Sequence, residues 1–100
     1  MLKHIVMWKL RDVAEGKTRQ ENADLMKEML EGLKDKISEI KQIEVGININ
    51  SSDAAFDVVL YSEFENEEAL VSYQKHPEHI KVADYVVKIN EKRIVVDYLV

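Results

Sequence analysis

The sequence contains no cysteine among its 100 residues. Disulfide frameworks, thiolate nucleophiles and cysteine-ligated zinc sites are therefore excluded. Basic residues are also few, with 14 lysines and arginines against 19 acidic residues and a formal net charge of −5. Binding to nucleic acid depends on clustered basic side chains that displace phosphate counterions, so we expect no nucleic-acid partner.

Long apolar runs are missing as well. No segment approaches the roughly 18 consecutive apolar residues that a transmembrane helix needs. Residues 1–6 lack the long apolar core and the small-residue cleavage site of a secretory signal. We therefore expect no membrane association and a cytoplasmic location.

The residues that are present have the composition of a globular protein, with 46% hydrophobic and 33% charged residues. A chain of this length forms one ordinary core and leaves little material for a second. We therefore expect a single domain over residues 1–100.

The sequence pattern predicts four strands: apolar and polar residues alternate over residues 42–49, and residues 2–10, 56–64 and 91–100 are expected to form strands with apolar residues on both faces. A polar turn is expected at 11–16. An amphipathic helix is expected to follow over about 17–36. Gly32 lies inside this helix and would let it lie close to the sheet. Its apolar stripe consists of Met26, Met29, Leu30, Leu33, Ile37 and Ile40.

A second helix is predicted to begin at an N-cap Asn66 and to break at Pro77, the only proline. Its second piece is expected to bury Ile80, Ala83, Val86 and Val87. The order β-α-β-β-α-β predicts an α+β, ferredoxin-like fold, in which helices cover one face of a four-stranded antiparallel sheet.

Three of the predicted strands carry apolar residues on both faces, although helices would cover only one. An exposed apolar face of that extent is uncommon in soluble monomers. We therefore expect a homodimer in which two sheets meet face to face and form a dimeric α/β barrel.

The stretch 73–79 concentrates the groups able to transfer protons near neutral pH. Tyr73, His76 and His79 lie within seven residues around Pro77. A phenol and imidazoles can donate, accept and relay protons without a cofactor. His76 and His79 also have a spacing that suits metal ligands on a helix, but Pro77 between them argues against it, so we expect no metal site and no cofactor.

Three segments resemble the stress-responsive A/B barrel (Dabb) family: Lys-His-Ile-Val-Met-Trp-Lys-Leu at 3–10, His-Pro-Glu-His at 76–79 and Val-Val-Asp-Tyr at 95–98. The resemblance covers essentially the whole chain. It implies a ferredoxin-like protomer of the dimeric α+β barrel superfamily. The family includes plant stress proteins and a plant polyketide cyclase, while most bacterial members have no assigned role, so the activity stays undetermined.

The cyclase branch of this family implies roles for individual residues. His79 would act as acid and base, Tyr73 would assist it, and His4 would match a further histidine of the pocket. One departure is that Val58 stands where the cyclase carries another histidine. With Trp8 and His76, His4 is a candidate for lining a small-molecule pocket.

Each candidate also has a structural interpretation. His79 would hydrogen-bond at the Pro77 break, His76 would cap a helix, and His4, Trp8 and Tyr73 would belong to the core, where the Tyr73 hydroxyl needs a partner. Two functions therefore stay open: a pocket protein with cyclase- or lyase-like acid/base chemistry, and a non-enzymatic stress-responsive structural or interaction protein. A third, monooxygenase function, rests on fold analogy alone.

Overall fold

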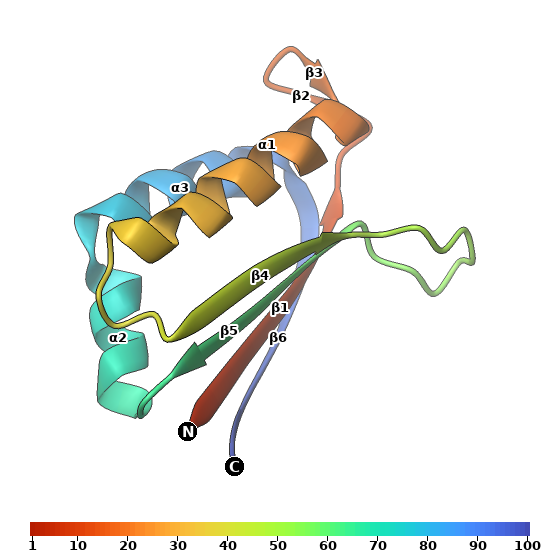
Figure 1. The fold of residues 1–100 in the computed structure, drawn as a ribbon. Coiled ribbons are helices and arrows are strands. Elements are labelled where there is room, and N and C mark those ends of the chain that lie inside the picture. Colours follow the sequence, from red (N-terminus) through yellow and green to blue (C-terminus); the bar gives the residue numbers. More distant parts are fainter.

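Four long strands and three α-helices form two layers in the computed structural model, which describes all 100 residues (Figure 1). The strands form one antiparallel sheet in the order β4-β5-β1-β6, which is the ferredoxin-like arrangement predicted from the sequence. The strands are β1 (Leu2–Leu10), β4 (Gln42–Ile47), β5 (Val58–Phe64) and β6 (Asn90–Leu99), and the helices are α1 (Arg19–Glu31), α2 (Glu67–Lys75) and α3 (Pro77–Ile89). No helix combines the length and apolarity that a membrane span requires.

The segment before α1 differs from the predicted turn, because it folds into a hairpin of β2 (Val13–Ala14) and β3 (Lys17–Thr18). Its turn is made by Glu15 and Gly16, both with positive φ (52° and 73°). Thr18 then caps α1 in a reciprocal capping box with Glu21, so the helix begins at Arg19 and not at residue 17.

The far end of α1 is also shorter than predicted. The α-helix ends at Glu31 and continues as one 3₁₀ turn, η1 (Gly32–Asp35). Gly32 does not mark a close approach to the sheet, because a Cβ at this position would meet no atom within 4 Å. Ile37 and Ile40 are buried beyond the helix, in a connection that the periodicity counted as helical.

The second helix breaks at Pro77, as predicted, but of the residues predicted for the buried face of α3 only Val86 is buried. The buried residues are Val82, Val86 and Ile89. Ile80 and Val87, which the sequence pattern assigned to the buried face, are 46% and 69% exposed. This part of the sequence carries two apolar stripes, and packing against the sheet decides which of them is covered.

Two predicted strand ends are corrected. β4 ends at Ile47, and Ile49 lies fully exposed in the loop that follows. β5 begins at Val58, so Phe56 and Asp57 precede the strand. The backbone N–H of Asp57 donates to the Trp8 carbonyl and its carboxylate accepts from the Leu10 N–H, which fastens this loop to the end of β1.

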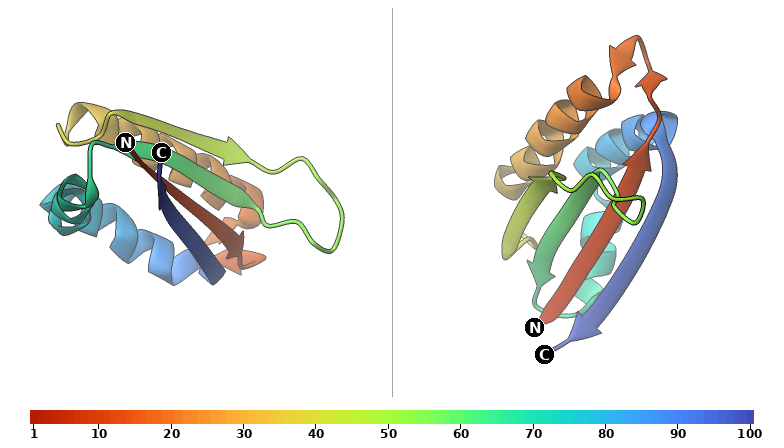
Figure 2. Two further views of the ribbon diagram at one scale, coloured as in Figure 1. Left: turned by 90° about the horizontal axis from the view of Figure 1, so that it is seen from below. Right: turned by 90° about the vertical axis from the view of Figure 1, so that its right-hand side faces the viewer.

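All three helices lie on one side of the sheet (Figure 2). Between the helices and the sheet is a core to which β1 contributes Leu2, Val6, Trp8 and Leu10. The helices do not cover β6, whose helix-side residues Val95 and Leu99 are 49% and 63% exposed. The helix side of β6 is therefore left uncovered by the helices.

The other face of the sheet carries no helix. We call it the open face, and it consists of alternate residues of β1, β5 and β6, namely Ile5, Met7, Val59, Tyr61, Ile94, Val96 and Tyr98. Ile94 and Val96 are 47% and 53% exposed. The structure thus has the second apolar face that the alternation predicted.

Candidate functional site

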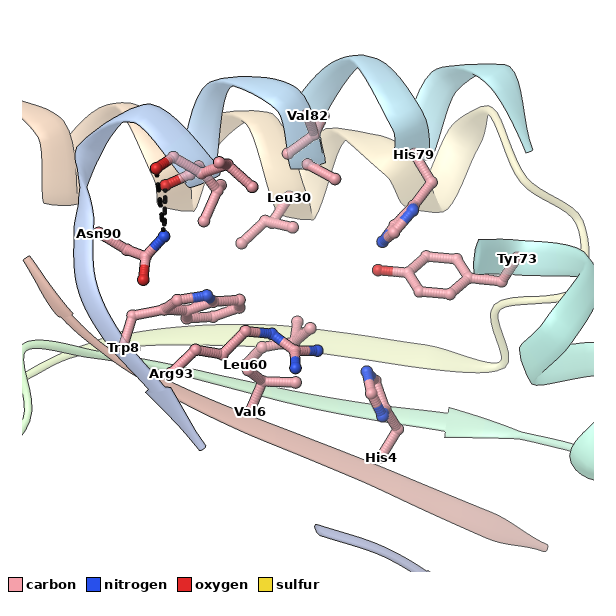
Figure 3. A pocket seen from close by; sticks show the side chains of 13 residues that line it. His4, Val6, Trp8, Leu30, Leu60, Tyr73, His79, Val82, Asn90 and Arg93 are labelled. Atoms are coloured by element: carbon pink, nitrogen blue, oxygen red, sulfur yellow. Dashed lines mark hydrogen bonds between the residues drawn. The ribbon is translucent and has the colours of Figure 1, made fainter. Parts of the chain in front are cut away.

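A cavity of about 110 Å³ lies between the sheet and helices α2 and α3 (Figure 3). Its walls are mostly apolar, and β1, β5, α1 and α3 supply them: Val6, Leu60, Leu30, Val82 and Val86. The polar groups on it come from elements that are far apart in sequence: His4, Trp8, Tyr73, His79, Asn90 and Arg93. A few polar groups that converge in an apolar pocket are typical of a small-molecule site.

Tyr73 lies in the last turns of α2 and is fully buried. Its hydroxyl has no hydrogen-bond partner within the protein, although the side chain reaches the cavity (Figure 3). Burial raises the pKa of this phenol well above its usual range, while the nearby charge of Arg93 acts weakly in the opposite direction. At neutral pH Tyr73 is therefore an uncharged donor.

His79 lies in the first turn of α3 and packs against Tyr73, with ring centroids 4.5 Å apart. Its Nδ1 is 3.1 Å from the Gln74 carbonyl oxygen at the end of α2. A carbonyl only accepts, so Nδ1 is the donor and Nε2 of the neutral ring carries a lone pair. Desolvation lowers the pKa of His79, the bond to Gln74 opposes this, and the unprotonated ring is favoured at neutral pH.

His4 is buried near the start of β1 and pairs with Asp97 of the neighbouring strand β6. Its Nδ1 forms a hydrogen bond with the Asp97 carboxylate. Because an ionised carboxylate only accepts, this bond fixes the proton on Nδ1 and leaves Nε2 for the cavity. A carboxylate that orients a histidine in this way is a common device of proton-transfer sites.

The two other predicted site residues have different surroundings. Trp8 lines the cavity with its side chain 5% exposed, and its Nε1–H has no hydrogen-bond partner within the protein. His76 does not line the cavity, because it is the N-cap of α3 and its Nδ1 accepts from the Glu78 N–H. The structure therefore gives His76 the capping role that was its structural interpretation.

Sequence reasoning missed two charged residues of the site. Asp97 and Arg93 lie on β6 directly opposite His4 and Trp8 in the β1–β6 ladder. Alternation alone places both on the helix side of the sheet, but only the pairing register shows which residues they face. Val58, where the resemblance places a histidine of the cyclase, is buried and does not line the cavity.

The polar groups do not have the arrangement of a metal site. No group of three or more histidine, aspartate or glutamate side chains is gathered closely enough to hold a metal ion. The Nδ1 atoms of His4 and His79 face Asp97 and a backbone carbonyl, which leaves one ring nitrogen of each histidine for the cavity.

Comparison with known proteins gives the family and leaves the activity undetermined. A dimeric protein of unknown function and ferredoxin-like fold from Bacteroides fragilis is 37% identical, with 99% of this chain and 95% of that chain covered and a TM-score of 0.84. A hydroxynitrile lyase from Passiflora edulis is 17% identical, with 99% and 92% covered and a TM-score of 0.80. A putative antibiotic biosynthesis monooxygenase from Nitrosomonas europaea is 16% identical, with 100% and 98% covered and a TM-score of 0.76.

At these low identities the lyase and the monooxygenase show a shared fold and no more. No curated protein matches the sequence. The sequence model of the Stress responsive A/B Barrel Domain matches residues 2–100, which is almost the whole chain. The family predicted from the three motifs is thus confirmed, and the chain belongs to the stress-responsive A/B barrel (Dabb) family.

Proposed function

We propose that this protein binds a small molecule in the cavity and carries out cofactor-free acid/base chemistry on it, of the type used by cyclases and lyases. The observation that carries the proposal is the buried Tyr73 hydroxyl, which lines the cavity without a hydrogen-bond partner. A buried polar group without a partner costs about 1–3 kcal/mol. A buried group of this kind calls for an explanation, and we infer that a ligand accepts its hydrogen bond.

The proposed chemistry is proton removal next to a carbonyl group. His79 Nε2 takes the proton from the carbon, and the electron pair of the broken C–H bond moves to the carbonyl oxygen. The Tyr73 hydroxyl donates a hydrogen bond to the resulting oxyanion. The depressed pKa of His79 supports the base role, because the ring stays unprotonated at neutral pH.

The His4–Asp97 pair supplies a second oriented imidazole on the same cavity. In the proposed reaction the unprotonated Nε2 of His4 contacts the substrate and accepts a hydrogen bond from it, and His79 returns the proton that it took after the new bond has formed or broken. Asp97 does not touch the substrate and acts by positioning His4. The Passiflora edulis protein of similar fold, a hydroxynitrile lyase, supports lyase-like chemistry as one form of this proposal.

The test is deuterium exchange. The protein is incubated in D₂O with small ketones and aldehydes that fit the cavity, such as acetophenone and 3-methylbutan-2-one, and NMR measures deuterium incorporation next to the carbonyl. Wild-type protein should accelerate exchange, and Tyr73→Phe and His79→Gln should each lower the rate at least about 100-fold. Acceleration that persists in both variants contradicts the assigned roles.

A specific contact favours the second candidate, the non-enzymatic structural or interaction protein. His79 joins α2 to α3 through Gln74, and His76 caps α3, so both histidines stabilise the helix junction. If no carbonyl compound exchanges and none binds, this candidate replaces the enzymatic one. The predicted cytoplasmic location is part of the proposal in either case.

We also propose that the protein is a homodimer, paired through the open faces of two sheets as a dimeric α/β barrel. The proposal is supported by the apolar residues of the open face and by the dimeric state of the similar Bacteroides fragilis protein. Burying the open face would remove the exposed side chains of Ile94, Val96 and Tyr98 from water.

A further inference from the structure

Arg93 is a cation without a counter-charge on the cavity. It lies on β6 opposite Trp8 and makes no ion pair and no side-chain hydrogen bond. Arg93 is exposed, and Figure 3 shows its guanidinium group on the sheet side of the cavity, in view between the labelled side chains of Trp8 and His4. The protein has an excess of acidic residues, yet no aspartate or glutamate lines the cavity.

The polar groups without partners around Arg93 are donors. The Trp8 Nε1–H and the Tyr73 hydroxyl are both buried without a hydrogen-bond partner. The guanidinium adds further N–H groups, all of which only donate. The charge of Arg93 also acts at the other end of the cavity, where, beside the larger effect of desolvation, it opposes the raised pKa of Tyr73 and adds to the lowered pKa of His79. The Nε2 atoms of His4 and His79 can accept hydrogen bonds, but no negatively charged acceptor lines the cavity to balance Arg93.

We propose that the ligand is a small monocarboxylic acid with an apolar body, whose carboxylate is bound by Arg93 and by the Trp8 Nε1–H. This inference rests on the proposed function and specifies its substrate class. Arg93 is then the residue that selects acids over neutral molecules. The apolar body packs against the valine and leucine walls, and a carbonyl group on that body, separate from the bound carboxylate, lies toward Tyr73 and His79 and activates the neighbouring carbon for the proposed proton removal.

The number of charges and the size of the cavity favour a monocarboxylate over a phosphate. Arg93 is the single formal charge on the cavity wall, and a doubly charged phosphate would keep one charge unbalanced in an apolar surrounding. A guanidinium also binds the planar carboxylate through two parallel hydrogen bonds. A cavity of about 110 Å³ accommodates one small ring or short branched chain, comparable to a benzene-binding cavity of about 150 Å³.

Trp8 makes the experiment specific, because it is the only tryptophan in the chain. Its indole ¹H–¹⁵N signal reports on one atom of the proposed site. Wild-type protein is titrated with sodium benzoate and, separately, with benzamide, which has the same size and shape but no charge. Benzoate should saturate the shift of the Trp8 signal at a concentration about 10- to 100-fold lower than benzamide.

Two variants with the same change in charge are compared. Arg93→Gln should weaken benzoate binding about 10- to 100-fold and leave benzamide binding unchanged. Arg11→Gln is the matched control, because Arg11 is exposed in the turn after β1 and does not line the cavity. It should bind benzoate like the wild type. Circular dichroism verifies that both variants are folded.

The outcomes separate this inference from the proposed function. If benzamide binds as tightly as benzoate, or if Arg93→Gln binds benzoate normally, the carboxylate inference is wrong and the pocket proposal survives. If neither compound shifts the Trp8 signal and the ketones of the exchange assay also fail, both proposals are contradicted. If inorganic phosphate competes with benzoate at equal concentration, the choice of a monocarboxylate is overturned.

Discussion

The rings of Tyr73 and His79 lie 4.5 Å apart and are inclined by 57°, although they belong to two different helices. The break at Pro77 explains this contact. His76 ends α2 and caps α3, so the first turn of α3 folds back against the last turn of α2. His79 uses Nδ1 for the Gln74 carbonyl at the junction and keeps Nε2 for the cavity. The structural and the chemical interpretations of this histidine are therefore compatible.

Tyr73→Phe should separate stability from function. The variant removes a buried hydroxyl that has no partner, so the free energy of unfolding should stay unchanged or rise by about 1 kcal/mol. Deuterium exchange at the carbonyl substrates should fall at least about 100-fold in the same variant. Urea unfolding at a fixed protein concentration measures the first effect, because dimerisation couples stability to concentration.

Tyr85→Phe is the matched control. The Tyr85 hydroxyl donates to Asn22 Oδ1 at 2.6 Å, and Asn22 is fully buried between α1 and α3. Removing this hydroxyl leaves the amide oxygen without its donor and should cost about 1–3 kcal/mol. A comparable loss in Tyr73→Phe would show that the Tyr73 hydroxyl has a structural partner, and would contradict its role as a donor for the ligand.

The depressed pKa of His79 predicts how stability depends on pH. The unfolded chain binds a proton on this ring near pH 6.5, while desolvation keeps the native ring neutral to lower pH. The contribution of His79 is thus fully present above pH 6.5 and is lost as the pH falls to the lowered native pKa. Wild-type protein should lose more stability over this window than His79→Asn, whose amide can still donate to Gln74.

Urea unfolding of both proteins from pH 8 to pH 5 measures this difference. His4 and His76 are present in both proteins, so their contributions cancel in the comparison. Parallel curves would mean that His79 has the same pKa in the native and unfolded states, and would remove the argument that it is neutral in the site.

The alternating strands and the helical periodicity were sufficient to predict the fold. They give the order of the elements, and the ferredoxin-like sheet follows from that order. The helix ends were harder to predict, because Thr18 and Glu21 form a capping box inside a polar stretch that looks like continuous helix. The buried stripe of α3 was predicted only in part, with Val86 correct, because two apolar stripes compete there and the choice depends on contacts with the sheet.

The site was predicted in part, for a similar reason. Tyr73 and His79 are close in sequence and carry recognisable chemistry. Asp97 and Arg93 are about 90 residues from His4 and Trp8, and they meet them only through the register of the β1–β6 ladder. A single sequence shows that these strands alternate, but it does not fix how two neighbouring strands are aligned.

Glu31 should contribute to acid sensitivity. Its carboxylate accepts from the Lys27 ammonium and from the Val45 N–H on the outer edge of β4, at 2.9 and 3.0 Å. These bonds, the one to Lys27 foremost, lower the pKa of Glu31 below 4.5. The stability it provides is present above pH 4.5 and is lost as the pH falls through the lowered native pKa.

Glu31→Gln should therefore be less stable than the wild type near neutral pH, by about 0.5–1.5 kcal/mol, and the difference should shrink at lower pH. Glu28→Gln is the control, because Glu28 is exposed and its side chain makes no hydrogen bond or ion pair. The midpoint of urea unfolding from pH 7 to pH 3 provides the measurement. A constant difference across this range would contradict the assigned contacts.

If the open face is the dimer interface, a charge introduced on it should prevent dimerisation. Val96 is paired with Ile5 at the middle of the β1–β6 ladder and is 53% exposed in the protomer. Val96→Asp would bury a carboxylate without a partner if two open faces pack together, which costs several kcal/mol per protomer. Light scattering after size-exclusion chromatography should give twice the 11.6 kDa mass for the wild type and the single mass for the variant.

Ile49→Asp is the control for this experiment, because Ile49 is fully exposed in the loop after β4 and lies outside the sheet. It introduces the same charge and should leave the dimer intact. The variant at Val96 should also be less stable, since the dimer no longer covers the other residues of the open face. A dimer that tolerates Val96→Asp would require an interface away from the open face, for instance at the edge of β6, where Leu99 is 63% exposed.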